Sequence, residues 1–169
     1  MSFIAIDTNI FLHLFNPAEN TDSHIDKLLG ALITSHYQLL VDSTRKIGNE
    51  YQQKIVPIIR NLDETKPQLP LLRFWVNPDI RHEVELDGTD ALMVKIKSVM
   101  HEPDEHADRA FVYVACKEGA VLVSNDFSHI RDRRDEILKK TRKERGSNAD
   151  IQSSREAAVT FLKVEVQRD

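Results

Sequence analysis

The sequence contains one cysteine and no long hydrophobic run. Cys116 has no second cysteine for an internal disulfide or a structural zinc site, as in proteins of a reducing compartment, and we expect it to be a small core residue. The longest apolar runs are short, and Asp7 interrupts the first of them. We therefore expect no membrane span, no secretory signal and a cytoplasmic location.

Glycine and proline are also scarce, with 5 and 6 copies in 169 residues. Together with 41% hydrophobic and 30% charged residues, this scarcity excludes disordered, collagen-like and low-complexity chains. The length suits one hydrophobic core. We predict a single folded domain over residues 1–169, without repeats or a linker.

The net charge of −4 argues against a nucleic-acid partner, because phosphate binding usually leaves a basic footprint. The charge is unevenly distributed, however. Residues 131–145 contain eight Lys and Arg against four Asp and Glu, so this segment carries +4 and the rest of the chain −8. A basic segment near the C-terminus of an acidic chain needs an explanation.

Uninterrupted short apolar runs predict buried parallel strands, and an alternating pattern predicts an edge strand or hairpin. The runs lie at 3–6, 38–42 and 120–124, with an extended piece at 149–152 and the alternation at 80–86. Amphipathic stretches predict helices at 9–15, 23–33, 44–62 (kinked at Pro57), 71–75, 89–99, 104–119, 126–145 and from 153 onward. The alternation of strands and helices predicts a three-layer α/β/α fold with a central parallel sheet.

Polar residues at the helix starts predict how each helix begins. Ser23 with Asp26 and Ser153 with Glu156 have the spacing of a capping box. Ser43 or Thr44 is expected to cap the helix at 44–62, and Asp87 or Thr89 the helix that follows.

Four acidic residues are expected at one edge of this sheet. Asp7 and Asp126 follow strands, Asp108 lies in the first turns of a helix that leads into a strand, and Glu50 lies two turns into a helix that leaves one. In parallel sheets, ligands and catalysis gather at the carboxyl ends of the strands. The sequence therefore brings four carboxylates from four segments to one rim.

Each acid also has a structural interpretation. Asp7 could cap the following helix, Asp126 could be a turn residue, and Glu50 could pair with Lys46 or Lys54. Asp108 lies on an apolar stripe, where an unpaired carboxylate is costly, so it needs a cationic partner. Like charges this close raise one another's pKa unless a cation is present. A carboxylate cluster favours Mg²⁺ or Mn²⁺, which can activate water for phosphodiester hydrolysis.

The sequence resembles the PIN-domain family of metal-dependent ribonucleases. The resemblance is carried by FIAIDTN (3–9), IGNEY (47–51), DRAFVYVA (108–115) and VLVSND (121–126). It implies the strand order 3-2-1-4-5 and Mg²⁺- or Mn²⁺-dependent hydrolysis of single-stranded RNA by a toxin or defence effector, with an antitoxin protein and a second copy of the chain as partners. By position, it implies metal ligands at Asp7, Asp108 and Asp126, a metal ligand or water-orienting group at Glu50, and supporting residues at Thr8 and Asn125.

Two features depart from the family pattern. Residues 63–90 resemble an insertion and receive no role. Asp104 and Glu105 add acids that could replace or extend the ligand set. Three histidines, His101, His106 and His129, flank the site, and we interpret them as solvated loop residues.

The basic segment has two interpretations. Its side chains could hold the RNA backbone beside the acidic site, with Arg133, Arg134, Lys139 and Lys140 as the central contacts and Arg131, Arg142 and Lys143 beside them. Alternatively, it is an ordinary charged helix with the pairs Asp135/Lys139 and Glu136/Lys140.

Three further functions stay open. The chain could be a structure-specific DNA nuclease of related fold, or a catalytically silent PIN-like binding module. A phosphatase of the haloacid dehalogenase type also begins with a strand and Asp, but Asn9 stands where such enzymes need a second Asp.

Overall fold

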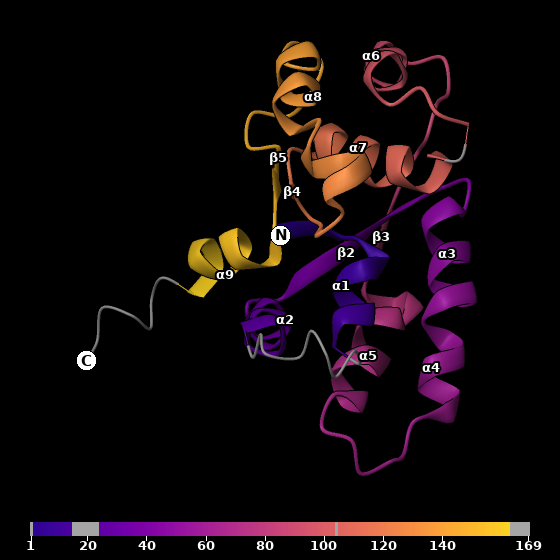
Figure 1. The fold of residues 1–169 in the computed structure, drawn as a ribbon, viewed down its shortest axis with the longest axis vertical. Helices are drawn as coiled ribbons and strands as arrows, with labels where there is room; N and C mark the ends of the chain where they lie inside the picture. Colours follow the sequence, from indigo (N-terminus) through magenta and orange to yellow (C-terminus); the bar gives the residue numbers. More distant parts are fainter. Residues whose placement is uncertain (1, 15–23, 104, 163–169) are drawn as a thin grey trace.

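The computed structural model describes residues 2–14, 24–103 and 105–162. In this part of the chain, five parallel strands form one sheet in the order β3-β2-β1-β4-β5 (Figure 1). The strands are β1 (Ser2–Ile6), β2 (Tyr37–Asp42), β3 (Arg81–Val84), β4 (Val121–Val123) and β5 (Asp150–Gln152). The predicted strand order 3-2-1-4-5 is confirmed, and the edge strand expected at 80–86 is β3.

Strand β1 lies in the centre of the sheet. Ile4 pairs with Leu39 of β2 and with Val121 of β4, and Ile4, Ala5 and Ile6 are fully buried. Such continuous apolar strands are stable only where helices cover both faces of the sheet. The register carries over to the next residue, because the Asp7 backbone N–H donates to the Val123 carbonyl at 2.9 Å. Asp7 is thereby fixed at the carboxyl edge, beside the end of β4.

Helices cover both faces of the sheet, which confirms the three-layer architecture (Figure 1). Helix α7 packs against β1, β2 and β4, while α2 and α9 pack together across the sheet from it. The helices are α1 (Thr8–His13), α2 (His24–Thr34), α3 (Lys46–Lys54), α4 (Val56–Asn61), α5 (Leu69–Val76), α6 (Ala91–Val99), α7 (His106–Glu118), α8 (Arg134–Lys140) and α9 (Ser154–Leu162). Two shorter turns are η1 (Pro78–Ile80, 3₁₀) and η2 (Phe127–Arg131, π).

The helix predicted at 44–62 is two helices, because the chain breaks at Ile55, ahead of Pro57. Its predicted cap is also wrong. The backbone N–H groups of Lys46 and Ile47 donate to the Asp42 carboxylate at 3.0 and 2.8 Å, rather than to Ser43 or Thr44. A carboxylate at the end of β2 satisfies two of the free amides of the helix, which a single hydroxyl cannot do as well.

The helix predicted at 126–145 is wrong as one continuous element. The chain forms the π turn η2 first, and α8 then spans only seven residues. Helix α6 begins with Asp90 as its cap, in place of the expected Asp87 or Thr89. The capping box of α9 is confirmed, since the Ser153 N–H donates to Glu156 at 2.7 Å and the Glu156 N–H donates to the Ser153 hydroxyl at 3.2 Å. The cap predicted at Ser23 lies outside the described residues.

Two glycines meet where α7 ends. Gly119 closes the helix with a φ of 64°, a left-handed conformation that suits glycine, and a Cβ added to Gly146 would lie 2.4 Å from the Gly119 Cα. Cys116, one turn earlier, is a buried free cysteine, as expected.

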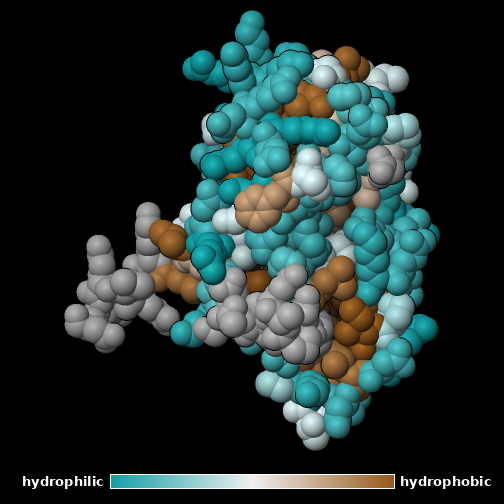
Figure 2. Space-filling model, viewed as in Figure 1, coloured by the Kyte–Doolittle hydropathy of each residue, from teal (hydrophilic) through white to brown (hydrophobic). Residues whose placement is uncertain are grey.

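Hydrophilic residues cover most of the face in Figure 2, with a hydrophobic patch in the region of α5. Within the described ranges, every helix is too short or too polar to cross a membrane.

Candidate metal centre

Asp7 is buried at the carboxyl edge and fully hydrogen-bonded. It caps α1 by accepting from the Asn9 N–H at 3.3 Å, and it also accepts from the Asn9 amide at 2.7 Å and the Ser124 hydroxyl at 2.6 Å. Only 4% of the residue is exposed. Burial raises the pKa of Asp7 to about 7, and the charges of Asp108 and Glu50 add to this, against the hydrogen bonds from Ser124 and Asn9. Asp7 is therefore a helix cap and a member of an acidic group.

Asp108, Asp126 and His129 form the tightest cluster of potential metal ligands in the described part of the chain. One ligand atom from each residue lies within 4.8 Å of the other two. The His129 Nδ1 lies 3.1 Å from an Asp126 oxygen and 3.7 Å from an Asp108 oxygen. Helix α7 supplies Asp108 from its first turn, while Asp126 caps η2 and so fixes the turn that carries His129. The His129 imidazole thus lies beside Asp108, the carboxylate that needs a cationic partner because it lies on an apolar stripe.

The pKa values of the three residues in this cluster are shifted in different directions. Burial raises the pKa of Asp108 to about 6, and the neighbouring charges of Asp126 and Glu50 contribute to the increase. For Asp126, burial acts in the same direction, but hydrogen bonds donated by His129 and Ser128 outweigh it and lower the pKa. For His129, the opposing effect of burial is outweighed by Asp126 and Asp108, so its pKa is raised. Without a metal, the cluster therefore favours an imidazolium between two carboxylates.

Glu50 lies on α3, next to the inward-facing Tyr51, with its side chain only 12% exposed. It makes the 2.8 Å ion pair with Lys54 that its spacing suggested. Its charge also acts on the titration of Asp7 and Asp108, so it shares their electrostatic environment. Asp7 and Glu50 stand outside the 4.8 Å cluster in the described chain. The four predicted acids thus meet at one edge of the sheet. Asp108 and Asp126, together with His129, form the inner group, and Asp7 and Glu50 form the outer one.

His129 is the site residue that sequence reasoning undervalues. It follows Asp126 by three residues, and in a helical turn this spacing places two side chains on one face. The sequence contains this signal, but it depends on a turn beginning at Asp126. A long surface helix, which the sequence predicts here, would leave His129 solvated. The π turn instead directs it to the carboxylates.

The supporting residues have mixed surroundings. Thr8 is buried, and its hydroxyl has no hydrogen-bond partner within the described residues. The Asn125 N–H donates to Asn9 at 3.2 Å, and its amide group bonds to Ser154 at the start of α9. Asn125 thereby ties the end of β4 to two helices. Asp104 lies outside the described residues.

Glu105 has a structural partner. The residue is 1% exposed and forms an ion pair with Arg133, which reaches it from the start of α8. It also accepts from the Glu102 N–H at 3.1 Å. A carboxylate committed in this way acts on Asp108 and His129 only as a nearby charge. The structure therefore gives Glu105 a role in holding η2 and α8 against the loop before α7.

The basic segment divides into paired arginines and exposed cations. Arg134 pairs with Asp150 at 2.8 Å and Glu156 at 3.5 Å, and Arg131 pairs with Glu156 at 2.6 Å. Lys140 pairs with Glu136 at 3.1 Å, as one of the two predicted helix pairs. Lys139, Arg142 and Lys143 make no ion pair with any described residue. The RNA-binding role predicted for Arg133, Arg134, Lys139 and Lys140 stays a prediction, and the structure leaves Lys139 the freest of the four.

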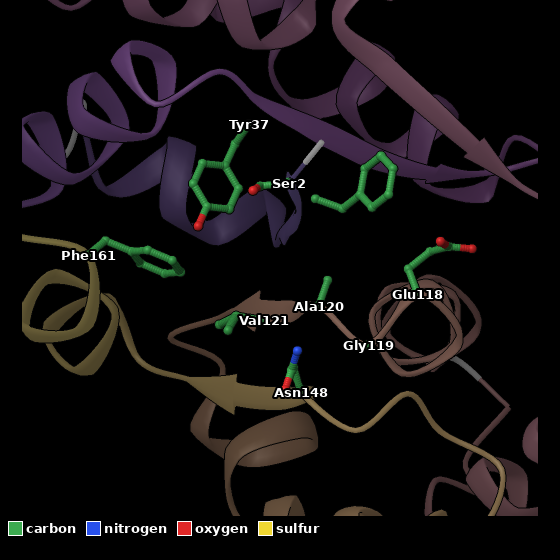
Figure 3. A pocket seen from close by; sticks show the side chains of 9 residues that line it. Ser2, Tyr37, Glu118, Gly119, Ala120, Val121, Asn148 and Phe161 are labelled. Atoms are coloured by element: carbon green, nitrogen blue, oxygen red, sulfur yellow. The ribbon is translucent and has the colours of Figure 1, made fainter.

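A hollow of 310 Å³ opens at the opposite, amino edge of the sheet (Figure 3). The rings of Tyr37 and Phe161 meet beside it with their centroids 5.5 Å apart, and Glu118 is the acid that lines it. A single carboxylate, with no second acid and no imidazole among the lining residues, lacks the ligand set of a metal site. The acidic carboxyl edge is therefore the chemical centre of the described chain.

The donor set at this edge fits a divalent cation. Four carboxylates and one imidazole provide hard oxygen ligands and one nitrogen. Burial and mutual repulsion raise the pKa values of Asp7 and Asp108, so holding both groups ionised is costly when no cation is present. A bound cation would reverse this penalty.

The strand order 3-2-1-4-5 and an acidic carboxyl edge are the features that the sequence resemblance to the PIN-domain family implies. No family model and no curated protein matches the chain. Among solved structures, it is similar to the crystal structure of VapBC2 from Rickettsia felis bound to a DNA fragment from their promoter. The sequences are 14% identical, the match covers 89% of this chain and 98% of that one, and the TM-score is 0.43. The description of the fold rests on the strand order and on the helices that cover the sheet.

Proposed function

We propose that the protein is a metal-dependent nuclease, an endoribonuclease that hydrolyses single-stranded RNA with Mg²⁺ or Mn²⁺. The observation that carries the proposal is the acidic edge, where burial and mutual repulsion raise the pKa of Asp7 to about 7 and that of Asp108 to about 6. A fold keeps such a costly arrangement where a cation or a reaction uses it. RNA as the substrate rests on the sequence resemblance.

The inner group would hold the metal. Asp108 and Asp126 offer oxygens and His129 offers Nδ1. Asp7 lies outside this cluster, at the end of β1, and would add a further carboxylate ligand. When bound, the ion supplies charge for the phosphodiester oxygens and lowers the pKa of the attacking water. The hydrogen bonds from Ser124 and Asn9 fix the orientation of Asp7, and the bonds that η2 donates fix that of Asp126.

Glu50 would orient the attacking water. Its carboxylate shares the electrostatic environment of Asp7 and Asp108, and Lys54 holds one of its oxygens at 2.8 Å. The other oxygen is left to accept a proton from water. Tyr51, the next residue, donates its hydroxyl to the Ile6 carbonyl and so anchors α3 to the end of β1. This anchor holds Glu50 in position relative to Asp7.

The structure disfavours the phosphatase alternative. Asn9 donates its amide to Asp7 at 2.7 Å and accepts from the Asn125 N–H at 3.2 Å. An amide in this position orients Asp7 but cannot deliver or accept a proton as a second Asp would. An antitoxin partner, a homodimer and a toxin or defence role belong to the proposal through the resemblance alone.

The test compares cleavage of labelled single-stranded RNA and DNA in Mg²⁺, Mn²⁺ or EDTA. We expect RNA cleavage with a divalent ion, none in EDTA, and a loss of at least about 100-fold in Asp7→Asn and Asp126→Asn. Asp79→Asn, an exposed acid on η1, is the matched control and should retain activity.

The other outcomes of this experiment distinguish the alternative functions. Preferential cleavage of DNA would support the DNA nuclease instead. Cleavage that survives both substitutions would identify a contaminant. No cleavage, together with no rise in melting temperature when either ion is added, would favour a silent binding module and overturn the proposal.

A further inference from the structure

A small pocket beside the acidic edge is lined by positively charged side chains. Its volume is 130 Å³, several times the roughly 10–15 Å³ that one water molecule requires. The lining residues are Lys46 of α3, Leu86 and Gly88 of the loop before α6, Met93 and Lys97 of α6, and His106 and Arg109 of α7. Four of the seven have basic side chains and none is acidic. Helix α7 packs against both α3 and α6.

Among the described residues, Arg109 is a buried cation without a carboxylate partner. Only 7% of the residue is exposed, and its guanidinium donates to the carbonyls of Met100 and Glu102 at 2.8 and 3.0 Å and to His106 Nδ1 at 2.9 Å. All three acceptors are neutral or weakly basic. No carboxylate of the described residues lies within ion-pair distance of this guanidinium. A buried charge without a counter-charge is costly, so the pocket favours an anion.

The neutral His106 and the two lysines extend this preference. Arginine can only donate hydrogen bonds, so His106 Nδ1 is the acceptor and its other ring nitrogen carries a proton that it can donate. The Lys97 ammonium bonds only to the Gly88 carbonyl, at 3.1 Å, and Lys46 makes no ion pair in the described part of the chain. The nearby Asp87 carboxylate already accepts from the N–H and hydroxyl of Thr89. Asp87 stays charged but does not line the pocket, so the lining itself presents several donors and no acid.

The pocket and the acidic edge are neighbours on two helices. Lys46 and Glu50 are one turn apart on α3, so they share a face and lie about 6 Å apart along its axis. On α7, Asp108 and Arg109 are adjacent and leave the helix about 100° apart. Asp108 turns to the ligand cluster, while Arg109 turns to the pocket. An extended chain that crosses the acidic edge would pass this pocket with its next phosphates.

The geometry points to a binding site for a phosphate group of the nucleic-acid strand, next to the phosphate that is cleaved. Arginine and lysine are the preferred partners of phosphate, and an enclosed site with one buried arginine strengthens their hydrogen bonds. This inference rests on the proposed function and adds a second point at which the substrate backbone is held. It also places a basic site outside the segment 131–145, where the sequence suggested one.

The test measures binding without cleavage. Fluorescence anisotropy of a short labelled single-stranded RNA is followed in EDTA across a KCl series, for the unsubstituted protein and for Lys46→Ala, Lys97→Ala and the double variant. Lys66→Ala, an exposed lysine between α4 and α5, is the matched control. The two pocket lysines are surface residues, so their variants should fold, which circular dichroism checks.

We expect the double variant to bind RNA about tenfold more weakly. The slope of the logarithm of its binding constant against the logarithm of the KCl concentration should become shallower by about 0.7 for each phosphate that the protein no longer neutralises. The control should bind RNA as the unsubstituted protein does. Titration with inorganic phosphate, followed by calorimetry, distinguishes a backbone phosphate from free phosphate. Loss of phosphate binding with unchanged RNA binding would overturn the inference in favour of a small-anion site. Unchanged RNA affinity and salt slope in the double variant would also overturn it.

Failure of the nuclease proposal has a different signature. A protein that cleaves nothing with any metal can still lose RNA affinity in the pocket variants. A protein that cleaves RNA can show no effect of these variants on binding. The two results are independent because the binding experiment contains no divalent ion.

Discussion

At the scale of single residues, the buried carboxyl of Asp7 decides how the protein responds to pH. A folded-state pKa of about 7, against an unfolded value near 3.8, means that ionisation of this group opposes folding. The stability that the neutral form provides is fully present below pH 3.8 and is lost as the pH rises through about 7. Metal binding requires the charged form and therefore releases protons.

We predict that Asp7→Asn, relative to the unsubstituted metal-free protein, is about 1–3 kcal/mol more favourable for stability at pH 8 than at pH 4, because the loss of the acceptor for Asn9 and Ser124 costs the same at both pH values. The amide keeps the shape of the side chain and removes the charge whose burial is costly. Urea unfolding in EDTA at both pH values measures the difference. Asp79→Asn serves as the exposed control, and an equal effect of Asp7→Asn at both pH values would contradict the predicted pKa.

His129 should tune the choice of metal. An imidazole ligand favours a first-row transition ion such as Mn²⁺ over Mg²⁺, whereas carboxylates accept both. We predict that His129→Gln weakens Mn²⁺ binding by about tenfold or more and Mg²⁺ binding much less. Calorimetry in the absence of substrate provides the measurement, with His101→Gln, an exposed histidine, as the control. Equal losses for the two ions would exclude a ligand role.

At the scale of elements, the acidic edge depends on ties between segments. The Glu105–Arg133 ion pair joins the loop before α7 to the start of α8, across the turn that carries His129. The Glu105 side chain has no exposed surface, whereas Arg133 is about one quarter exposed. Removing the arginine leaves a carboxylate buried without a partner, which is more harmful than losing both groups.

We predict that Arg133→Ala lowers the free energy of unfolding by about 2–4 kcal/mol and that Lys139→Ala changes it by less than about 0.5 kcal/mol. Chemical denaturation distinguishes a structural arginine from a surface lysine. The double variant Glu105→Gln with Arg133→Ala should recover part of the loss. If Arg133→Ala is as stable as the unsubstituted protein, the ion pair with Glu105 is not needed for folding, and Arg133 is available for the RNA contact that the sequence suggested.

The end of α7 has its own constraint, because Gly119 and Gly146 are in direct contact. An added methyl group at Gly146 would overlap the Gly119 backbone at 2.4 Å, and backbone cannot rotate away as a side chain can. We predict that Gly146→Ala lowers the melting temperature, corresponding to about 1–3 kcal/mol. Gly30→Ala in α2 meets open space and should raise stability by about 0.5–1 kcal/mol, which makes it a matched control.

At the scale of the whole molecule, acidic and basic side chains gather in different places of the fold. The acids that follow β1 and β4 and those of α3 and α7 gather at the carboxyl edge, and cations that pair with no described carboxylate border it in the small pocket. Most arginines of the basic segment instead pair with acids of β5, α9 and the loop before α7. The net charge of −4 therefore conceals both an acidic site and a local basic one.

The sequence predicted the elements well where one local rule decides them. Short apolar runs placed β1, β2 and β4, an extended piece placed β5, and the alternation at 80–86 marked the edge strand β3. The sequence-based prediction failed where several neighbouring side chains could cap the same backbone amides, because only the geometry decides among them. Asp42 replaced Ser43 or Thr44 as a cap, and the capping bonds of Asp126 turned the start of a predicted helix into η2.

By itself, the sequence determined the parallel sheet and the edge to which Asp7, Glu50, Asp108 and Asp126 belong, because hydrophobic periodicity and strand direction are local properties. Only the tertiary structure decided which groups lie within reach of one another. It brought His129 to the carboxylates, paired Arg133 with Glu105, and left Arg109 buried beside Lys46. Side chains distant in sequence acquire partners, burial and altered pKa values only when packing removes water from around them.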